Sequence, residues 1–300
     1  MKIVITGARG FIGMHLARRL AMSGHAVIGL TRCDKEDTYR AIDIQTGNGI
    51  DSTQASLARH ISGSDAVVHL AARQVASLSE PLQAYIPSNI VLTEDIARIV
   101  SESGVPRLVF ASSRLVYPGW CPDVCTETCP HEPDTMYGLS KRVGEDLLRI
   151  YARKYNWTSV SLRLGQIFGP DPKKRGVVFR FIEQARTAGK VTVFGQGLAV
   201  RDFIYLEDVL SAFEAALVSE AASGAYNIGS SRGYSVCELA TAVSTAFLDG
   251  KVNVEHKHVE SEDQTRYVMD CHKALRDMNW QPQWTLTEAL RDMRDVDDGL

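Results

Sequence analysis

The first 24 residues, MKIVITGARGFIGMHLARRLAMSG, contain the pattern that decides the fold. The apolar run at residues 2–6 predicts a buried strand, residues 7–13 form a glycine-rich turn, and residues 14–24 have the composition of a helix. Glycines let the backbone approach a pyrophosphate, and the N–H groups at the start of a helix stabilise its negative charge. The order of strand, turn and helix therefore predicts a dinucleotide-binding loop.

Short β-branched runs recur beyond this loop, separated by segments long enough to form helices. They are HAVIGL at 25–30, DAVVHLAA at 65–72, PRLVFASS at 106–113 and TSVSLRL at 158–164. This alternation is typical of a parallel sheet with helices on both faces. We therefore expect an α/β fold, a Rossmann-type doubly wound parallel sheet with a smaller, interleaved C-terminal substrate lobe.

The alternation becomes irregular after Phe168, where the polar stretch GPDPKKRG begins. We expect residues 1–168 to form the dinucleotide-binding domain and residues 169–300 to form mainly the substrate-binding lobe. A strand followed by a helix is predicted within residues 200–220, and this segment could cross back to the first domain. A helix is also expected at 81–103, because proline and glycine flank it.

The composition of the 300-residue chain excludes several classes of protein. With 45% hydrophobic and 23% charged residues it can bury a large core, and a formal net charge of -3 gives no basic surface for nucleic acid. No apolar run suggests a membrane span. The six cysteines are scattered, unlike a secreted disulfide framework, so we expect a cytoplasmic protein with a small-molecule partner.

The end of the second predicted strand indicates which dinucleotide is bound. An acidic side chain at this place usually accepts a hydrogen bond from the ribose of NAD, whereas this chain has Thr31 and Arg32. A guanidinium pairs well with a 2′-phosphate, which favours NADP; the alternative, in which Asp34 or Asp43 serves NAD, stays open. The residues expected to hold the cofactor are Gly7, Arg9, Gly10, Phe11, Ile12, Gly13, Thr31, Arg32, Asp43, Ile44, Leu70, Ala71, Ala72, Tyr137 and Lys141.

A serine, a tyrosine and a lysine suit hydride transfer at a carbon that bears oxygen. Tyr137 and Lys141 are four residues apart in a predicted helix and so share one face, while Ser112 and Ser113 end the strand PRLVFASS. Tyrosine can exchange the proton of the substrate oxygen, and a nearby ammonium or nicotinamide cation favours its phenolate form. A serine hydroxyl can donate a hydrogen bond to the same oxygen.

Seven segments in this order resemble the extended short-chain dehydrogenase/reductase family of nucleotide-sugar epimerases, dehydratases and reductases. They are TGARGFIG, DAVVHLAA, LVFASSRLVY, YGLSK, LRLGQIFGP, VRDFIYLEDV and AYNIGS, and they span most of the chain. The resemblance implies that Ser113 is the catalytic hydroxyl beside Tyr137 and Lys141, and that the protein is a homodimer. It also implies a nucleotide-sugar site, for which the candidate residues are Arg73, Gln166, Val191, Phe194, Arg201 and Arg266.

Three departures from the family pattern bear on the reaction and on the ligand. Sugar 4,6-dehydratases carry an Asp-Glu pair directly after the catalytic hydroxyl, whereas this chain has Arg114 and Leu115; leucine cannot transfer a proton, so dehydration is not expected. Gln166 stands where the family usually has asparagine, and Glu260 replaces a common arginine.

Three functions remain. We expect an NADPH-dependent ketoreductase acting on a nucleoside-diphosphate 4-keto-6-deoxyhexose. The alternative is an NAD-dependent nucleotide-sugar 4-epimerase similar to UDP-glucose 4-epimerase, and a remote alternative is a non-enzymatic NADP-binding regulatory module. The spacing of Cys121, Cys125, Cys129 and His131 matches no common zinc pattern, so we expect no metal and interpret this segment as a loop over the substrate pocket.

Overall fold

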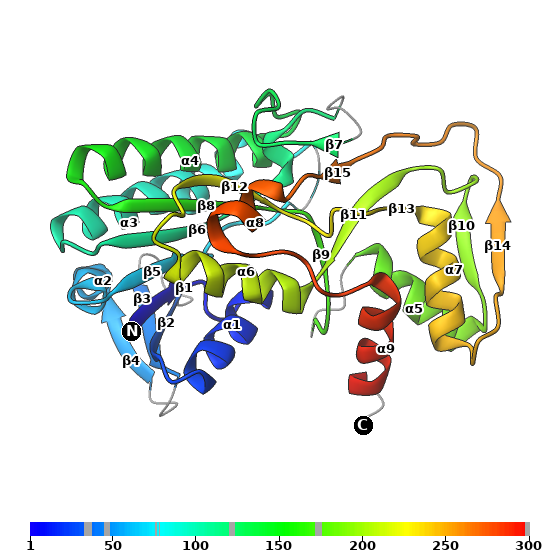
Figure 1. Ribbon diagram of the computed structural model, residues 1–300, viewed down its shortest axis with the longest axis horizontal. Helices are drawn as coiled ribbons and strands as arrows, with labels where there is room; N and C mark the ends of the chain where they lie inside the picture. The colour runs from blue at the N-terminus through cyan, green and yellow to red at the C-terminus, as the bar shows by residue number, and fades with distance from the viewer. Residues whose placement is uncertain are drawn as a thin grey trace.

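The computed structural model describes residues 1–32, 38–44, 49–75, 77, 79–119, 124–171 and 176–297. A large sheet dominates one end of the molecule, and a smaller lobe occupies the other (Figure 1). The sheet has eight strands in the order β12-β8-β6-β5-β1-β2-β3-β4. Their bounds are β1 (Lys2–Thr6), β2 (Ala26–Arg32), β3 (Thr38–Asp43), β4 (Gly49–Thr53), β5 (Ala66–His69), β6 (Arg107–Ser113), β8 (Thr158–Leu164) and β12 (Gly224–Ile228).

Six neighbouring strands of this sheet, from β12 to β2, are parallel. The predicted α/β class and doubly wound parallel sheet are therefore confirmed. The sheet also has an antiparallel edge that the strand pattern did not predict, because β3 pairs with β2 and β4 pairs with β3 in antiparallel register.

Helices cover both faces of the sheet, as the buried residues of β1 require. Ile3 and Ile5 belong to the core under α1 (Phe11–Met22) and α6 (Leu206–Val218), whereas Val4 belongs to the core on the opposite face. Successive side chains of a strand point to opposite faces, so a fully apolar strand has to be covered twice. The opposite face carries α2 (Gln54–Ile61), α3 (Leu92–Glu102) and α4 (Met136–Tyr155).

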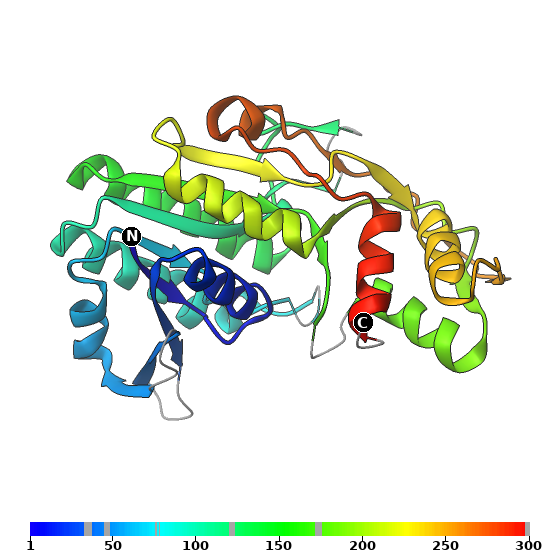
Figure 2. The same ribbon diagram turned by 60° about the horizontal axis from the view of Figure 1, so that its bottom comes forward.

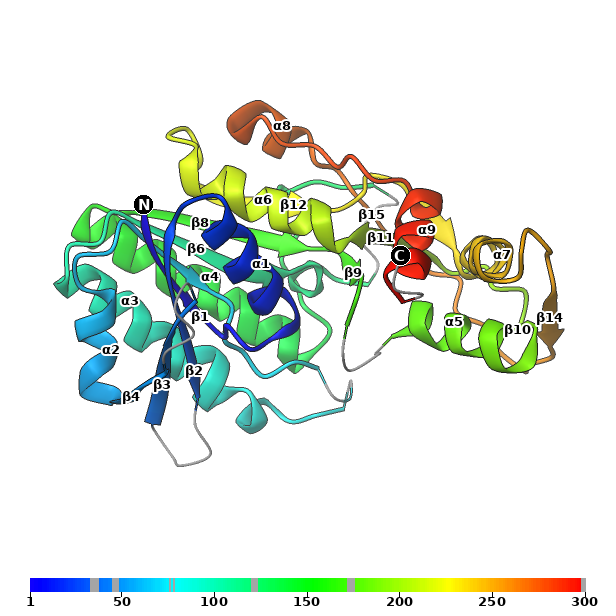
Figure 3. The ribbon, with the colours of Figure 1, turned by 90° about the horizontal axis from the view of Figure 1, so that it is seen from below.

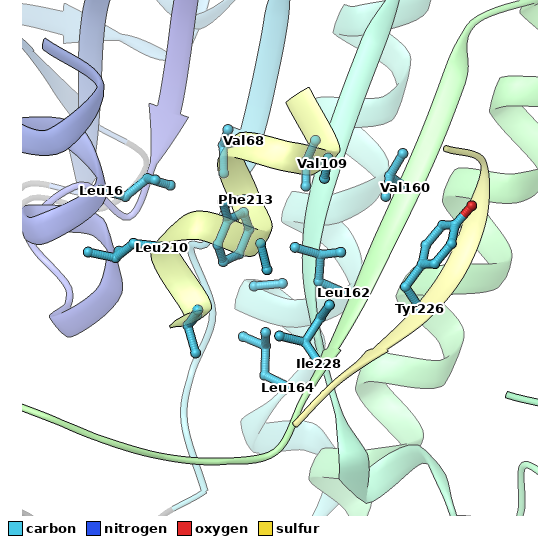
Figure 4. Close-up of a cluster of buried hydrophobic side chains, with 14 of the residues drawn as sticks. Leu16, Val68, Val109, Val160, Leu162, Leu164, Leu210, Phe213, Tyr226 and Ile228 are labelled. Carbon is cyan, nitrogen blue, oxygen red and sulfur yellow. The ribbon is translucent and has the colours of Figure 1, made fainter. Parts of the chain in front are cut away.

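Figure 2 shows α1 and α6 side by side on their face of the sheet. Figure 4 shows side chains from both helices, including Leu16 and Phe213, among residues of the parallel strands such as Val109 and Leu162. Burial of large apolar side chains contributes about 1.5–3 kcal/mol each. This packing fixes the strands whose carboxyl ends form the site.

The helix expected at 81–103 is present but begins irregularly. A short 3-10 turn, η1 (Leu82–Ala84), leads into the wider π-type turn η2 (Ile86–Val91), and α3 follows. Pro87 lies within η2. Proline has no N–H to donate to the preceding turn and crowds its carbonyl, which accounts for an irregular start.

The smaller lobe has a hydrophobic core of its own. It contains the three-stranded sheet β13-β11-β9, the parallel pair β10 and β14, and three helices (Figure 3). The bounds are β9 (Gln166–Phe168), β10 (Val191–Phe194), β11 (Val200–Tyr205), β13 (Gly233–Ser235), β14 (Val254–Lys257), α5 (Val177–Ala188), α7 (Val236–Phe247) and α9 (Leu286–Asp297).

The chain passes between the two parts more than once. After β11 it enters α6 and then β12, which pairs with β8 at the edge of the large sheet. It then returns to the smaller lobe through β13. A short pair, β7 (Val124–Cys125) and β15 (Val268–Met269), and the helix α8 (His272–Met278) complete the described elements.

A buried ion pair joins α4 to the sheet. Arg163 in β8 is 2% exposed and Glu145 in α4 is 8% exposed. The guanidinium donates from Nε to Oε1 at 3.0 Å and from Nη2 to Oε2 at 2.7 Å. Ser112 Oγ donates to the same Oε1, and Arg163 Nη1 donates to the Tyr117 hydroxyl at 2.7 Å. The pair therefore holds α4 against the ends of β6 and β8.

Replacing Glu145 by glutamine removes the charge that Arg163 requires while keeping the side-chain shape. We expect Glu145→Gln to lower the free energy of unfolding by about 3–5 kcal/mol, because a buried guanidinium loses its counter-charge. Urea denaturation followed by circular dichroism measures the change. The matched control is Glu102→Gln, whose exposed carboxylate pairs with Arg98 and where a loss below about 1 kcal/mol is expected. Equal losses in the two variants would contradict this prediction.

Candidate active site

The glycine-rich turn presents backbone donors at the carboxyl end of β1. Gly10 N donates to Gly7 O at 2.8 Å, α1 begins at Phe11, and no side chain caps this helix end. A Cβ atom on Gly13 would lie 2.3 Å from Gly7 O, so the helix can approach the strand only with glycine at this position. The first N–H groups of a helix have no acceptor within the helix and favour an anion. This donor set fits the diphosphate of a dinucleotide.

The end of β5 lies beside this turn. Ala71 N donates to Thr6 Oγ1 at 3.2 Å, and Leu70 N donates to Thr6 O at the same distance. The predicted segment Leu70–Ala72 thus borders the phosphate loop. Arg9 is exposed at the loop surface.

Thr31 is buried near the end of β2, and Ile44 packs against the core beside β3. The side chains of Arg32 and Asp43, like all of Asp34, lie outside the described residues. The selection of NADP by Arg32 therefore stays a prediction.

The structure brings Ser113, Tyr137 and Lys141 together at the carboxyl ends of β6 and β5. Ser113 ends β6, and its side chain forms a hydrogen bond with that of Tyr137. Lys141 is 3% exposed, its Nζ donates to Ala111 O at 2.8 Å, and it lies 5.9 Å from the centre of the Tyr137 ring. This is the arrangement that hydride transfer at an oxygen-bearing carbon requires.

Local contacts explain why Tyr137 lies so close to Ser113. Thr135 Oγ1 accepts a hydrogen bond from Gly138 N at 3.0 Å and so caps α4. A Cβ atom on Gly138 would lie only 1.9 Å from Leu115 O. Leu115 N in turn donates to Ser113 Oγ at 3.2 Å. The glycine after Tyr137 therefore allows the start of the helix to pack directly on the turn after Ser113.

Burial shifts the pKa values of the tyrosine and the lysine in opposite directions. Burial raises the pKa of Tyr137 to about 12, although the Ser113 hydrogen bond opposes the change. Burial lowers the pKa of Lys141 to about 7, against the field of the Glu145 carboxylate. In the protein alone, burial therefore outweighs the lowering of the tyrosine pKa that the sequence led us to expect from Lys141.

A second tyrosine, which the sequence did not indicate, borders Tyr137. The rings of Tyr85 and Tyr137 meet edge to face with their centres 5.8 Å apart. The Tyr85 hydroxyl donates to Glu80 Oε2 at 2.7 Å, and Arg73 Nε donates to Glu80 Oε1 at 3.0 Å. Arg73, a candidate for substrate binding, is thus paired with Glu80 close to the site. No local motif marks Tyr85 or Glu80.

His69 is a buried residue at the end of β5, close to Lys141. It is fully buried, with Nδ1 2.7 Å from Thr6 Oγ1 and Nε2 3.0 Å from Thr93 Oγ1. Burial and the charge of Lys141 lower its pKa to about 3, so the ring is neutral at physiological pH. Both ring nitrogens contact hydroxyls, which agrees with a structural role.

The candidate substrate-binding residues of the smaller lobe lie on several different elements. Arg201 forms an ion pair with Asp263 and donates from Nη1 to Val200 O and to Thr265 O, both at 2.8 Å. Arg266 lies beside β11, where it forms an isolated bridge with Val200.

The remaining candidates differ in their exposure. Gln166 begins β9 and pairs with Phe203 of β11. Val191 is completely buried in the core of the smaller lobe, whereas Phe194 is 59% exposed at the other end of β10. The side chain of Val191 is therefore unavailable to a nucleotide, while that of Phe194 is accessible.

Part of the cysteine-containing segment is held by strand pairing and burial, and its predicted position over the substrate pocket stays a prediction. Cys125 is fully buried in β7, which pairs with β15, and Asn227 N donates to Glu127 Oε1 at 2.8 Å. Cys121 lies outside the described residues. Among the side chains that the structure describes, no group of three or more His, Cys, Asp or Glu residues could hold a metal ion. No described helix has the length and apolarity needed to span a membrane.

Comparison with known proteins shows which family this chain resembles. Residues 3–229 match the model of the NAD dependent epimerase/dehydratase family. The chain is 29% identical to UDP-glucose 4-epimerase of Mycolicibacterium smegmatis over 307 aligned residues, covering 97% of this chain and 96% of that protein. It is 26% identical to UDP-glucuronate 4-epimerase of Thermodesulfobacterium geofontis over 303 residues, covering 96% and 93%.

Solved structures give the same result. UDP-N-acetylglucosamine 4-epimerase from Bacillus cereus has a TM-score of 0.83 and 25% identity, covering 100% of this chain and 97% of the other. MoeE5 in complex with UDP-glucuronic acid and NAD has the same TM-score and identity and covers 100% of both chains. The resemblance inferred from the seven motifs is thus confirmed: the chain is an enzyme that belongs to the NAD dependent epimerase/dehydratase family, within the extended short-chain dehydrogenases/reductases.

Proposed function

We propose that the protein is an NAD-dependent 4-epimerase of a UDP-linked sugar. The observation that carries the proposal is the meeting of Ser113, Tyr137 and Lys141 beside the phosphate loop. Relatives named as 4-epimerases support it, as does MoeE5, which is complexed with NAD and a UDP-sugar. The sequence pattern favours an NADPH-dependent ketoreductase, but both curated relatives reported above are named as 4-epimerases, so the 4-epimerase alternative is the better supported function.

In this proposal, NAD lies along the turn at residues 7–13 and the segment Leu70–Ala72, and the sugar nucleotide extends toward the smaller lobe. The division into a dinucleotide-binding domain and a substrate-binding lobe is part of the proposal. Bound NAD would supply the acceptor and later the donor of the hydride at C4. A homodimer and a cytoplasmic location remain predictions.

The side chains of the chain itself handle the proton and orient the reacting oxygen. Tyr137 Oη takes the proton of the C4 hydroxyl and returns it when the other face is reduced. Ser113 donates a hydrogen bond to the same oxygen while it is a carbonyl. Lys141 lies on the same face of α4 as Tyr137, where its ammonium form favours the phenolate.

The pKa values set a condition for this chemistry. A tyrosine with a pKa of about 12 is almost entirely protonated at neutral pH and so cannot accept a proton, and a lysine with a pKa of about 7 is only partly charged there. Positive charge added beside Tyr137 lowers its pKa. A bound nicotinamide cation is such a charge, so we expect cofactor binding to activate the base.

The proposed function is tested by offering the full-length protein UDP-glucose, UDP-galactose, UDP-glucuronate and UDP-galacturonate without added reductant. We expect interconversion within at least one pair, no net change in cofactor absorbance, and release of bound NAD when the protein is denatured. Consumption of NADPH with a nucleoside-diphosphate 4-keto-6-deoxyhexose, together with no interconversion of any pair, would show that the ketoreductase was the correct function.

Removing the Tyr137 hydroxyl tests its role as the acid and base. Tyr137→Phe should lower kcat by about 10²–10⁴-fold, because one proton-transfer group is lost. The dissociation constant for NAD should change little, because the ring is retained. The control is Tyr155→Phe at the exposed end of the same helix, which should leave kcat unchanged. Retention of more than about a tenth of kcat by Tyr137→Phe would mean that another group transfers the proton.

The lowered pKa of Lys141 predicts how the free energy of unfolding changes with pH. Its folded pKa is lowered to about 7 from 10.5, so between these pH values the unfolded chain binds a proton that the folded chain has released. In protein freed of nucleotide, Lys141 should therefore make the free energy of unfolding increase as pH rises from about 7 to about 10.5.

Lys141→Met keeps most of the side-chain volume without a titratable group. The difference in unfolding free energy between the unmodified protein and this variant, measured by urea denaturation across the pH range, isolates the contribution of Lys141. A difference that did not vary with pH would contradict the lowered pKa.

A further inference from the structure

Arg114 lies between the catalytic turn and the smaller lobe. It follows Ser113 directly and begins the 3-10 turn η3 (Arg114–Val116). Its guanidinium carbon lies 4.7 Å from the centre of the Tyr267 ring, in the segment just before β15. The charges of Arg201 and Asp263 act on it as well. The side chain therefore extends from the residue next to Ser113 toward Arg201, a candidate residue of the nucleotide-sugar site.

The charge of Arg114 has no ion-pair partner of its own in the described part of the chain. Burial lowers its pKa, and the nearby carboxylates do not offset this effect. Those carboxylates hold other groups: Asp202 accepts from Ser230 N at 2.6 Å and from Met269 N at 2.9 Å, while Asp263 pairs with Arg201. A largely buried guanidinium without a counter-charge is destabilising unless a ligand supplies one.

The contact of Arg114 with Tyr267 leaves its hydrogen-bonding capacity intact. The guanidinium lies over the face of an aromatic ring, and such a contact consumes none of its five N–H donors. A planar fork of donors matches a carboxylate, which can accept two parallel hydrogen bonds. The turn that carries Arg114 is held by the packing of Gly138 on Leu115, so the side chain starts from a fixed backbone.

We propose that Arg114 binds the carboxylate of a uronic-acid sugar, so that the preferred substrate is a UDP-linked uronate and not a neutral hexose. This inference rests on the proposed function. In the proposed function, the sugar lies between Ser113, which contacts the oxygen at C4, and the nucleotide, for which Arg201 is a candidate binding residue. Arg114 extends between these two places, and a carboxylate at C6 is the ionised substituent that such a sugar ring carries. A neutral hexose would leave the guanidinium desolvated without an anion.

The test compares Arg114→Met with the unmodified protein on UDP-glucuronate and UDP-glucose. The unmodified protein should prefer UDP-glucuronate. Because a hydrogen bond between charged groups contributes about 1.5–3 kcal/mol, Arg114→Met should lower kcat/KM for UDP-glucuronate by about 10–100-fold. The value for UDP-glucose should change less than about threefold. Arg232→Met, at an exposed position of the smaller lobe, is the matched control and should alter neither value.

Binding of UDP-glucuronate, UDP-glucose and UDP to the enzyme loaded with cofactor, measured by calorimetry, separates the possible outcomes. If Arg114→Met weakens the binding of UDP-glucuronate alone, the result supports the role of Arg114. Absence of epimerisation of any sugar would overturn the proposed function but would leave this binding result in place. Equal weakening of all three ligands would place Arg114 on the diphosphate and overturn the inference, as would unchanged binding of all three. If Arg114→Met fails to fold, Arg114→Lys keeps the charge without the planar fork and should lose affinity for UDP-glucuronate alone.

Discussion

The buried ion pair between Arg163 and Glu145 is the constraint on which the geometry of the site depends. Both carboxylate oxygens of Glu145 accept hydrogen bonds from the guanidinium, and Ser112 Oγ adds a third. Since an unpaired charge at this depth would cost several kcal/mol, α4 cannot slide along β8 or rotate without a large loss. Lys141 lies one turn before Glu145 on the same helix, and Ser113 follows Ser112 on β6. The pair thus holds Lys141 and Ser113, both proposed as catalytic residues, in a fixed relation.

The same polar network reaches the edge of the sheet through Tyr117. Its hydroxyl accepts from Arg163 and donates to Asn227 Oδ1 at 2.7 Å, and Asn227 Nδ2 donates to Cys125 O at 2.8 Å. Asn227 belongs to β12, the strand that returns to the large sheet from the smaller lobe. Because buried polar groups of this kind are satisfied only in one arrangement, the network also fixes the segment that precedes α4. The network therefore links α4, β8 and β12 to the segment that contains Tyr117 and Cys125.

Burial has an electrostatic consequence for the chemistry. The apolar and hydrogen-bonded surroundings that fix Tyr137 and Lys141 also favour their neutral forms, which is the opposite of what a phenolate base needs. We therefore expect the tyrosine to need added positive charge beside it before it can accept a proton. Burial also lowers the pKa of Arg114, the residue after Ser113, which disfavours its charged form unless an anion binds beside it.

Local patterns in the sequence determined the parallel sheet, the glycine-rich turn at the end of its first strand, and the shared helix face of Tyr137 and Lys141, whereas Ser113 was chosen from the family resemblance. Each depends on residues a few positions apart: apolar runs that require cover on both faces, glycines between a strand and a helix, and two side chains one helical turn apart. The antiparallel edge formed by β3 and β4 did not follow, because TYRAID and GIDST lack a continuous apolar run. TYRAID is stabilised by pairing with β2, and GIDST by pairing with β3.

Only the tertiary structure decided the contacts between distant segments. Tyr85 meets Tyr137 across 52 positions of sequence, Arg201 pairs with Asp263, and Arg114 lies over Tyr267. The large shifts in the pKa values of Tyr137 and Lys141 likewise arise from burial among several elements. A spacing pattern records which side chains share a strand or helix face, but the burial of a charge and the identity of its partner depend on how separate elements pack in three dimensions.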